Sequence, residues 1–373
     1  MKAITPPNQS KTHNNYISIA KAIGIICVVV WHSRPPEWLV ILTMFFAVPL
    51  FFFTSGYFYK PAKSTTELET FYKKRIKGLY LPFVKWSIIF LLLHNIFYHL
   101  NIYNSQYGFR GETSVLYTLN DFVKKFFLII FRMSDSEQLL GAFWFIRALF
   151  LAALIVATIQ YIFRKCTFIN RYIMFFLLLI GSYFTIHFDI NIPWVGSLGL
   201  ILFSAMFYVL GFCYRKIENN KFYSKFTLFL STLVTFLGLT YFDKVTGVLG
   251  IKDEYVFPYT IVAVSGVLMV LNFSKLIETT KHIKNFFYYV GNNTMVILAL
   301  HFICLKIVSL VKIGVYGLPI ERLAEFPVIK GNNAYWWLAY TFIGILIPLT
   351  CQRIYNVART RILSNISVYK KQL

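Results

Sequence analysis

The sequence predicts an all-α integral membrane protein that crosses the bilayer about ten times. Of its 373 residues, 57% are hydrophobic and 14% are charged, and the apolar residues gather into ten long runs. Soluble domains average about 25% charged residues, and about 20 consecutive apolar residues cross the hydrocarbon core as a helix. Ten such helices and their loops use almost the whole chain, so we expect no separate soluble domain.

The ten predicted spans follow one another along a single transmembrane domain, residues 17–357. They cover residues 17–34, 38–58, 79–100, 141–163, 171–188, 196–214, 226–243, 256–273, 288–312 and 335–357. Polar tails flank the domain at residues 1–16 and 358–373. No small-residue cleavage site follows the first tail, so we expect no cleaved signal peptide.

The charges of the loops predict the orientation. Of the 37 Lys and Arg residues, 23 lie on the side that holds both termini, nine lie on the other side and five lie inside spans, with Arg34, Arg171 and Arg353 at the span ends counted with the loops. Cytoplasmic loops carry an excess of Lys and Arg, so both termini are predicted to be cytoplasmic. This topology accounts for most of the net charge of +22, and we therefore expect no nucleic-acid partner.

Two outer loops are long. Residues 101–140 contain apolar residues at helical spacing near 115–131, with Lys124 and Lys125 between them, which predicts a helix in the outer interface. Residues 313–334 are either a cover over the bundle or a plain connector. The cysteines form no close pairs, which argues against a disulfide framework or a metal site.

The first span carries two polar residues on one face. Lys21 and His32 are eleven residues apart, which is three helical turns plus about 20° and roughly 16 Å along the axis. Ionisable residues inside a membrane are costly and by default mark a functional path within a bundle. The alternative is that Lys21 extends to the nearby interface and His32 ends the helix on the other side.

Other cations also lie within the predicted spans, and the spans contain no Asp or Glu except Asp243, the last residue of the span 226–243. The cations within the spans are Lys21, Lys85, Arg147, Lys306 and Lys312. His32 and His301 also lie within spans. Buried cations without carboxylates need water or an anionic ligand, such as a phosphate-bearing cofactor, a lipid phosphate or a transported ion. Lys85 and Lys312 could instead extend to an interface.

Five segments of the sequence form a pattern when taken in order. They are Ile17–His32, Val48–Tyr57, Phe71–Phe83, Phe143–Phe150 and Tyr289–His301. Together they resemble the acyltransferase 3 family of bacterial membrane O-acyltransferases, in particular its fucose 4-O-acetylase-like branch. That family has a basic residue, ten intervening residues and an essential histidine, which Lys21 and His32 match. The chain departs from the family at Lys21, where many members have the planar Arg, at Ser18, where Asp is frequent, and at Gly78, where many have a second Arg.

The resemblance implies a reaction and a location. It implies transfer of an acyl group, most often acetyl, from a cytoplasmic acyl-CoA to a hydroxyl of a surface polysaccharide or its lipid-linked precursor. Acetyl-CoA would be a co-substrate, with no bound cofactor and no metal, and the partners would be the glycan and membrane lipids. The protein would reside in the bacterial cytoplasmic (inner) membrane.

O-acetylation needs a base, a donor held nearby and an electrophilic site for the oxyanion. His32 is predicted to be the base, because a free imidazole titrates near neutrality, and Lys21 is the second candidate catalytic residue. The donor phosphates are predicted to bind cations at the cytoplasmic end, unless the cluster there is a topology signal alone. The cluster is Lys73, Lys74, Arg75 and Lys77, and Lys85 lies slightly deeper as a further donor-binding candidate.

Candidate acceptor-binding residues are Trp144, Arg147, His301 and Lys306. The alternatives are that Trp144 belongs to an interfacial belt and that His301 is structural. Ser55 is either a carrier of a covalent acyl group or part of a close helix contact permitted by Gly56. No carboxylate is available to complete a triad with Ser55, which favours direct transfer.

Two other functional classes suit parts of the pattern. An anion or lipid-phosphate transporter would explain the buried cations, but inverted-repeat transporters have matched Gly- or Pro-broken segments in both halves, which we do not find. An assembly subunit would leave the Lys21–His32 stripe without a purpose. The sequence therefore favours a membrane O-acetyltransferase.

Overall fold

The computed structural model describes residues 15–108, 115–134, 137–166, 170–193, 195–218, 220–242, 247–331 and 335–372. Within these ranges the regular structure is helical, apart from one short hairpin of β1 (Asn191–Ile192) and β2 (Gly196–Ser197), and loops connect the helices. Eight described helical segments are long and apolar enough to cross a bilayer, and two apolar helices of 17 residues are shorter. The predicted helical, multi-pass architecture is confirmed, whereas residues 1–14 of the predicted tail lie outside the description.

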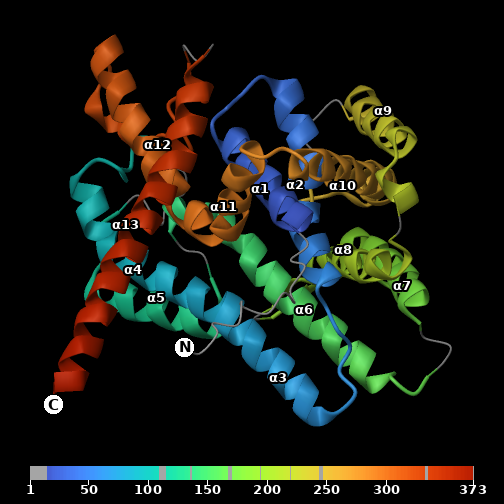
Figure 1. Ribbon diagram of the computed structural model, residues 1–373. Helices are drawn as coiled ribbons and strands as arrows, with labels where there is room; N and C mark the ends of the chain where they lie inside the picture. Colours follow the sequence, from blue (N-terminus) through green and yellow to red (C-terminus); the bar gives the residue numbers. More distant parts are fainter. Residues whose placement is uncertain are drawn as a thin grey trace, which may run out of the picture.

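Figure 1 shows the arrangement of the helices. Their bounds are α1 (Asn15–His32), α2 (Glu37–Tyr57), α3 (Thr65–Arg75), α4 (Leu81–His99), α5 (Leu119–Arg132), α6 (Trp144–Ile162), α7 (Arg171–His187), α8 (Leu198–Ile217), α9 (Lys225–Tyr241), α10 (Val256–Glu278), α11 (Ile283–Asn292), α12 (Thr294–Tyr316) and α13 (Trp336–Gln372). The short segments are η1 (Ile76–Tyr80), η3 (Gln138–Phe143), η4 (Asn220–Tyr223), η5 (Asp253–Tyr255) and η6 (Ile320–Ala324).

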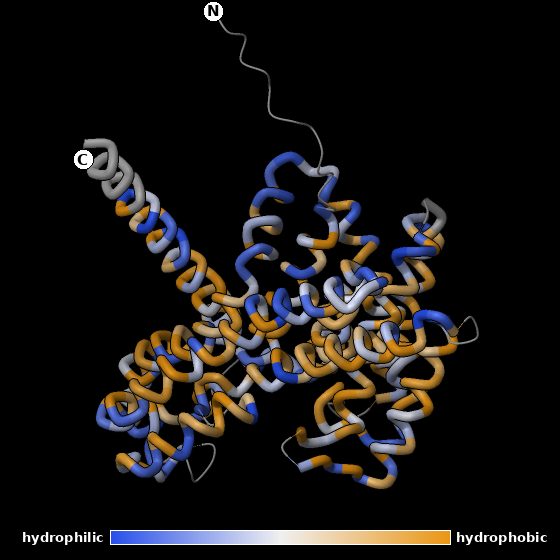
Figure 2. Tube along the Cα trace, turned by 90° about the horizontal axis from the view of Figure 1, so that it is seen from below, coloured by the Kyte–Doolittle hydropathy of each residue, from blue (hydrophilic) through white to orange (hydrophobic). Residues whose placement is uncertain are grey.

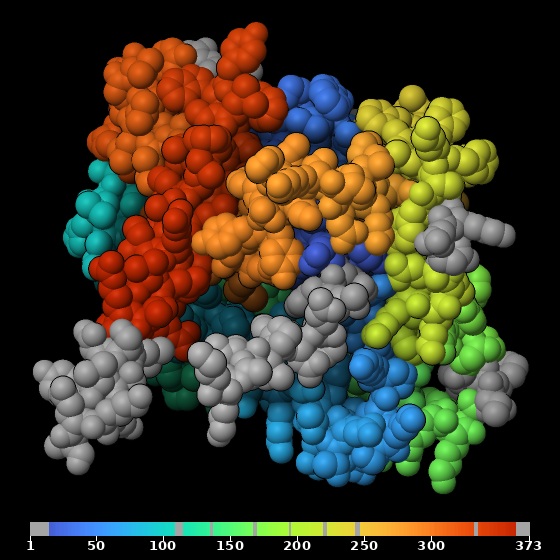
Figure 3. Space-filling view, viewed as in Figure 1, coloured from blue at the N-terminus to red at the C-terminus, as the bar shows by residue number. Residues whose placement is uncertain are grey.

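Helix α1 lies at the centre of the bundle. It packs against α2, α10, α11, α12 and α13, and the space-filling view shows that α10 and α11 leave little of it visible on one face (Figure 3). Most of α1 is apolar and buried, as expected of a helix surrounded by other helices. The half-buried Lys21 and His32 therefore lie inside the molecule and not on its rim.

Helices α2 and α8 approach each other closely at Gly56. A Cβ atom on Gly56 would lie 1.7 Å from the carbonyl oxygen of Tyr208, so no larger residue fits there. Small residues allow helix backbones to approach in this way. Gly56 therefore forms the close helix contact that the sequence predicts. The Ser55 side chain does not take part in this contact and points towards Arg75 instead.

A cluster around Glu218 joins the ends of α1, α2 and α8. One carboxylate oxygen accepts hydrogen bonds from the hydroxyls of Tyr16 (2.6 Å) and Tyr223 (2.7 Å), and the other accepts one from Tyr57 (2.6 Å). The ammonium of Lys275 on α10 lies 4.0 Å from the ring centroid of Tyr16, a cation–π distance. These contacts fix the first turn of α1, and with it the position of Lys21 one turn further along.

Hydrophobic stretches gather across the middle of the molecule, with hydrophilic stretches on two opposite sides (Figure 2). The predicted outer helix is present as α5, which begins with a capping box between Thr118 and Asp121. Two hydrogen bonds from Thr118 lower the pKa of the Asp121 carboxyl. Leu119, Phe127 and Phe131 on α5 are exposed, and its placement in the membrane interface stays a prediction.

The structure differs from the predicted spans in three places. Helix α3 precedes the third span and continues through the π-helix η1 into α4; the Ser64 hydroxyl caps it by accepting a hydrogen bond from the Glu67 amide. The predicted ninth span is two helices, because the polar pair Asn292 and Asn293 separates α11 from α12. Helix α13 continues beyond residue 357 to Gln372.

The predicted orientation places α5 outside the cell and Cys166 inside. Asn120, in the first turn of α5, and Cys166 are both exposed. In one variant Asn120→Cys supplies the sole cysteine, and in the control Cys166 does. We expect a membrane-impermeant maleimide to label the first in intact cells and the second only after permeabilisation. The reverse pattern would overturn the orientation.

Candidate active site

A cavity of about 250 Å³ lies between α1, α2, η1, α6 and α12. Lys21 on α1 and Arg75 at the end of α3 both line it, together with Ser55 and Thr294. Two basic residues that stand in separate sequence motifs therefore share one cavity, which we call the Lys21 cavity. No residue lining it is Asp or Glu, so it is a site for a neutral or anionic ligand.

The side chain of Arg75 is held in place from several sides. Its Nη1 donates to the hydroxyl of Ser55 and its Nη2 to that of Tyr208, both at 3.1 Å. The guanidinium also lies 4.8 Å from the ring centroid of Phe71. Arginine has five N–H donors, and within the described contacts two are engaged, which leaves the others for a ligand. The hydrogen bond also explains the direction of Ser55.

The N-terminus of α12 also meets the Lys21 cavity, where Thr294 and Met295 line it. No side chain caps this end: the Asn293 amide instead donates to the carbonyl of Tyr289 at 2.8 Å. The first amides of a helix have no partners within it and carry a partial positive charge. This end of α12 therefore adds to the positive potential that Lys21 and Arg75 supply.

His32 lies at the end of α1 beside a separate small cavity of about 20 Å³, which holds about one water molecule. Its ring stacks on Trp31 at a centroid distance of 4.6 Å and meets Phe302 at 4.5 Å. Neither ring nitrogen has a hydrogen-bond partner in the described part of the chain. The imidazole is thus held by aromatic contacts, with its nitrogens available to a substrate.

A second histidine lies next to the first. The ring centroids of His301 and His32 are 5.4 Å apart. Nδ1 of His301 lies 2.9 Å from the carbonyl oxygen of Leu298 and 3.1 Å from that of Ile297. Carbonyls only accept hydrogen bonds, so Nδ1 carries the proton and Nε2 has the free lone pair. This Nε2 is buried and has no hydrogen-bond partner among the described residues, so His301 can accept a proton or bind a hydroxyl.

Trp144 and Arg147 occupy different surroundings although both lie at the start of α6. Trp144 lines the small cavity beside His32, as an acceptor-binding residue would. Arg147 donates from Nη2 to the carbonyl of Val195 at 2.9 Å, next to the β1–β2 hairpin. The structure therefore brings Trp144 to His32 and directs Arg147 to the hairpin.

Three of the predicted donor-binding lysines lie outside the Lys21 cavity. Lys74, Lys77 and Lys85 are exposed, and the ammonium of Lys85 lies 5.3 Å from the ring centroid of Trp86. Only Arg75 of this predicted group lines the cavity.

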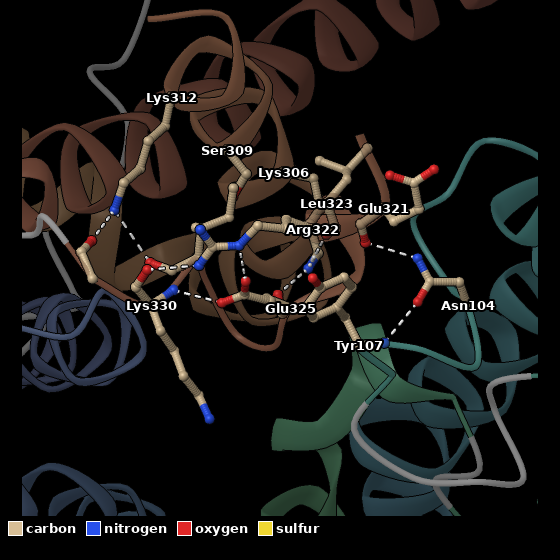
Figure 4. A network of polar contacts seen from close by, with 12 residues as sticks. Asn104, Tyr107, Lys306, Ser309, Lys312, Glu321, Arg322, Leu323, Glu325 and Lys330 are labelled. Carbon is tan, nitrogen blue, oxygen red and sulfur yellow. Dashed lines mark hydrogen bonds and ion pairs between the residues drawn. The ribbon is translucent and has the colours of Figure 1, made fainter. Parts of the chain in front are cut away.

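Lys306 and Lys312 on α12 bind the loop that follows this helix, which is predicted to lie outside the cell (Figure 4). Lys306 donates to the carbonyls of Leu323 (2.9 Å) and Glu325 (2.6 Å), and Lys312 donates to those of Ile329 and Gly331. Both lysines are almost fully buried, at 2% and 1% exposure. Both lysines thus have carbonyls of this loop as partners, while the contact of Lys306 with an acceptor and the extension of Lys312 to an interface stay predictions.

Hydrogen bonds within the same loop, and one from a neighbouring loop, also hold it in place. The Arg322 guanidinium donates to the Glu325 carboxylate, and this hydrogen bond raises the pKa of Arg322. The other Glu325 oxygen accepts from the Lys330 amide at 2.6 Å. From the neighbouring loop, Asn104 donates to the Glu321 carbonyl at 2.7 Å (Figure 4).

This loop reaches the His32 site through Phe302. The Phe326 ring meets Phe302 at 4.7 Å, and Phe302 meets His32. For residues 313–334, of which 332–334 lie outside the described residues, these contacts favour a cover over a plain connector.

Replacing Lys306 with methionine tests its part in the loop. We expect a loss of about 1–3 kcal/mol in stability, because buried carbonyls lose their donor, with unchanged substrate KM values in the folded fraction. Thermal unfolding in detergent and steady-state kinetics measure the two effects. Lys330→Met is the control, since Lys330 is exposed on the same loop. A raised acceptor KM without lost stability would restore Lys306 to the acceptor site.

Comparison with known families gives one match. Residues 14–353 match the model of the acyltransferase 3 family, described as an acyltransferase domain. No curated protein and no solved structure matches the chain. The matched range contains both cavities. The sequence analysis did not identify Tyr208, which binds Arg75, or Thr294, which lines the Lys21 cavity. The two asparagines Asn292 and Asn293 interrupt an apolar segment just before Thr294, and they could have indicated a helix start there.

Proposed function

We propose that this chain, which belongs to the acyltransferase 3 family, is an O-acetyltransferase that uses cytoplasmic acetyl-CoA. Family membership makes it a membrane acyltransferase. The proposal adds the acetyl donor, a hydroxyl acceptor on a cell-surface or lipid-linked glycan, and a place in the fucose 4-O-acetylase-like branch in the bacterial inner membrane. One observation carries it: the Lys21 cavity, with two cations and no carboxylate, ends beside the cavity of His32.

The donor would enter the Lys21 cavity from the side where α3 ends and η1 begins. Arg75, Lys21 and the start of α12 would bind its negative groups, and exposed Lys74 and Lys77 would attract it electrostatically. Lys85 would contribute least, because it packs on Trp86. The thioester would then lie along the face of α1 that leads from Lys21 to His32.

His32 would act as the general base. Its lone pair takes the proton of the acceptor hydroxyl while the hydroxyl oxygen bonds to the acetyl carbon. The C–S bond then breaks, and the proton passes from the imidazolium to the thiolate, which leaves as free CoA. Trp144 would stack on the sugar, and Nε2 of His301 would accept a hydrogen bond from it. No covalent acyl-enzyme is required, because no carboxylate or histidine lines the Lys21 cavity to activate the Ser55 hydroxyl as a nucleophile.

Because the chain belongs to an acyltransferase family, an enzyme is favoured over the alternative of an anion or lipid-phosphate transporter. Transfer of labelled acetyl from acetyl-CoA to fucosides and other glycosides by purified protein in detergent tests the proposal directly. Mass spectrometry of surface glycans with and without the gene identifies the natural acceptor. Glycans with unchanged acetylation, together with no turnover of acetyl-CoA in vitro, would contradict it.

A further inference from the structure

Three residues line both the Lys21 cavity and the small cavity of His32. They are Phe51 on α2, Phe145 on α6 and Leu298 on α12. The rings of Phe51 and Phe145 lie 5.4 Å apart between centroids, and Leu298 is 3% exposed. The two cavities are thus neighbours that share one apolar wall, which we call the Phe51–Phe145 wall.

The wall stands across the face of α1 that joins Lys21 to His32. Along this face Ile25 lines the Lys21 cavity and Val28 lines the His32 cavity. Gly24 lies between Lys21 and Ile25 on the chain, and a Cβ atom there would come within 3.2 Å of the Phe51 ring. A side chain at Gly24 would therefore make Phe51 shift by a few tenths of an ångström away from α1.

Resting on the proposed function, we propose that the Phe51–Phe145 wall is a gate that decides between transfer to an alcohol and hydrolysis. A thioester in the Lys21 cavity has Lys21 and Arg75 beside it, while the base lies beyond the wall. The wall must open before His32 and the acetyl carbon meet. Coupling this opening to acceptor binding next to Trp144 protects the thioester from premature attack.

The side reaction that the gate prevents is a simple one. Water at His32 would give up a proton to the imidazole and bond to the acetyl carbon, the C–S bond would break, and the thiolate would take the proton. The products are acetate and free CoA. Exclusion of water from a closed site is a general means of suppressing such hydrolysis, and the His32 cavity has room for about one water.

Phe145→Ala tests the gate, since it joins the two cavities. Acetate release without acceptor and acetyl transfer with acceptor are measured on the same purified protein, and their ratio is compared with that of the wild type. We expect the ratio of hydrolysis to transfer to rise about tenfold, equivalent to about 1.4 kcal/mol in the relative barriers. Phe150→Ala is the matched control: it lies on the same helix, packs against Tyr80 and lines neither cavity.

Leu298→Ala provides an independent opening of the same wall, and it is expected to raise the ratio in the same direction. Phe145→Leu, which retains most of the apolar bulk, should stay near the wild-type ratio. An unchanged ratio in both alanine variants, with transfer intact, would overturn the gate and leave the acetyltransferase proposal standing. A wild-type protein that neither transfers nor hydrolyses acetyl-CoA would instead overturn the proposed function, and the gate with it.

Discussion

His32→Ala is expected to lower acetyl transfer by about 10²–10⁴-fold, the usual contribution of a positioned general base. His32 is the histidine beside the small cavity that Trp144 also lines, and its ring nitrogens have no hydrogen bond in the described part of the chain. The protein should still fold and bind donor, because the ring contributes aromatic contacts and no hydrogen bond to the bundle. Transfer kinetics, thermal unfolding and donor binding on the same preparation separate these effects.

His99→Ala is the matched control for this substitution, since His99 is an exposed histidine at the end of α4. It should leave transfer unchanged. The companion variant His301→Ala removes the buried Nε2 next to His32, and it should affect the acceptor KM more than the donor KM. Wild-type transfer by His32→Ala at normal abundance would refute the mechanism and make His301 the base to test next.

Arg75→Glu is expected to raise the donor KM by about 10–150-fold or to abolish transfer. The lower and upper figures correspond to losing one hydrogen bond to a charged group, about 1.5–3 kcal/mol. The substitution also places a carboxylate in a cavity that has none, so it repels an anionic donor. Donor kinetics at saturating acceptor measure the change.

The control for Arg75→Glu is Lys74→Glu. Lys74 is the preceding residue and carries the same charge, but it is exposed and does not line the cavity, so its reversal should change the donor KM only slightly and in a salt-dependent way. Equal effects of the two reversals would mean that the cluster acts by general attraction or as a topology signal. Unchanged donor kinetics in Arg75→Glu would remove Arg75 from the donor site.

The fold class and the central stripe could be predicted because both depend on local regularities. Apolar runs of span length identify membrane helices from composition alone. The helical period places Lys21 and His32 on one face whatever surrounds them, and the bundle then buries that helix. The break within the ninth span was less visible, since it rests on two asparagines within an otherwise apolar segment.

The partners of the buried cations were decided by tertiary structure. Lys306 and Lys312 have no carboxylate within their helix, and sequence reasoning therefore assigned the first to a ligand and the second to an interface. Their partners are backbone carbonyls of the loop after α12. Every residue has a carbonyl, so no pattern of side chains marks the ones that a lysine will bind.

By itself, the sequence determined that this is a helical membrane protein with a basic residue and a histidine on one buried face, because the period of a helix and the thickness of a bilayer act on neighbouring residues. Only the tertiary structure decided that Arg75 joins Lys21 in one cavity through Ser55 and Tyr208. It also decided that two phenylalanines stand between that cavity and His32. Contacts of this kind depend on how helices that are far apart in the chain pack against each other. The sequence of a single helix has no periodic pattern that predicts this packing.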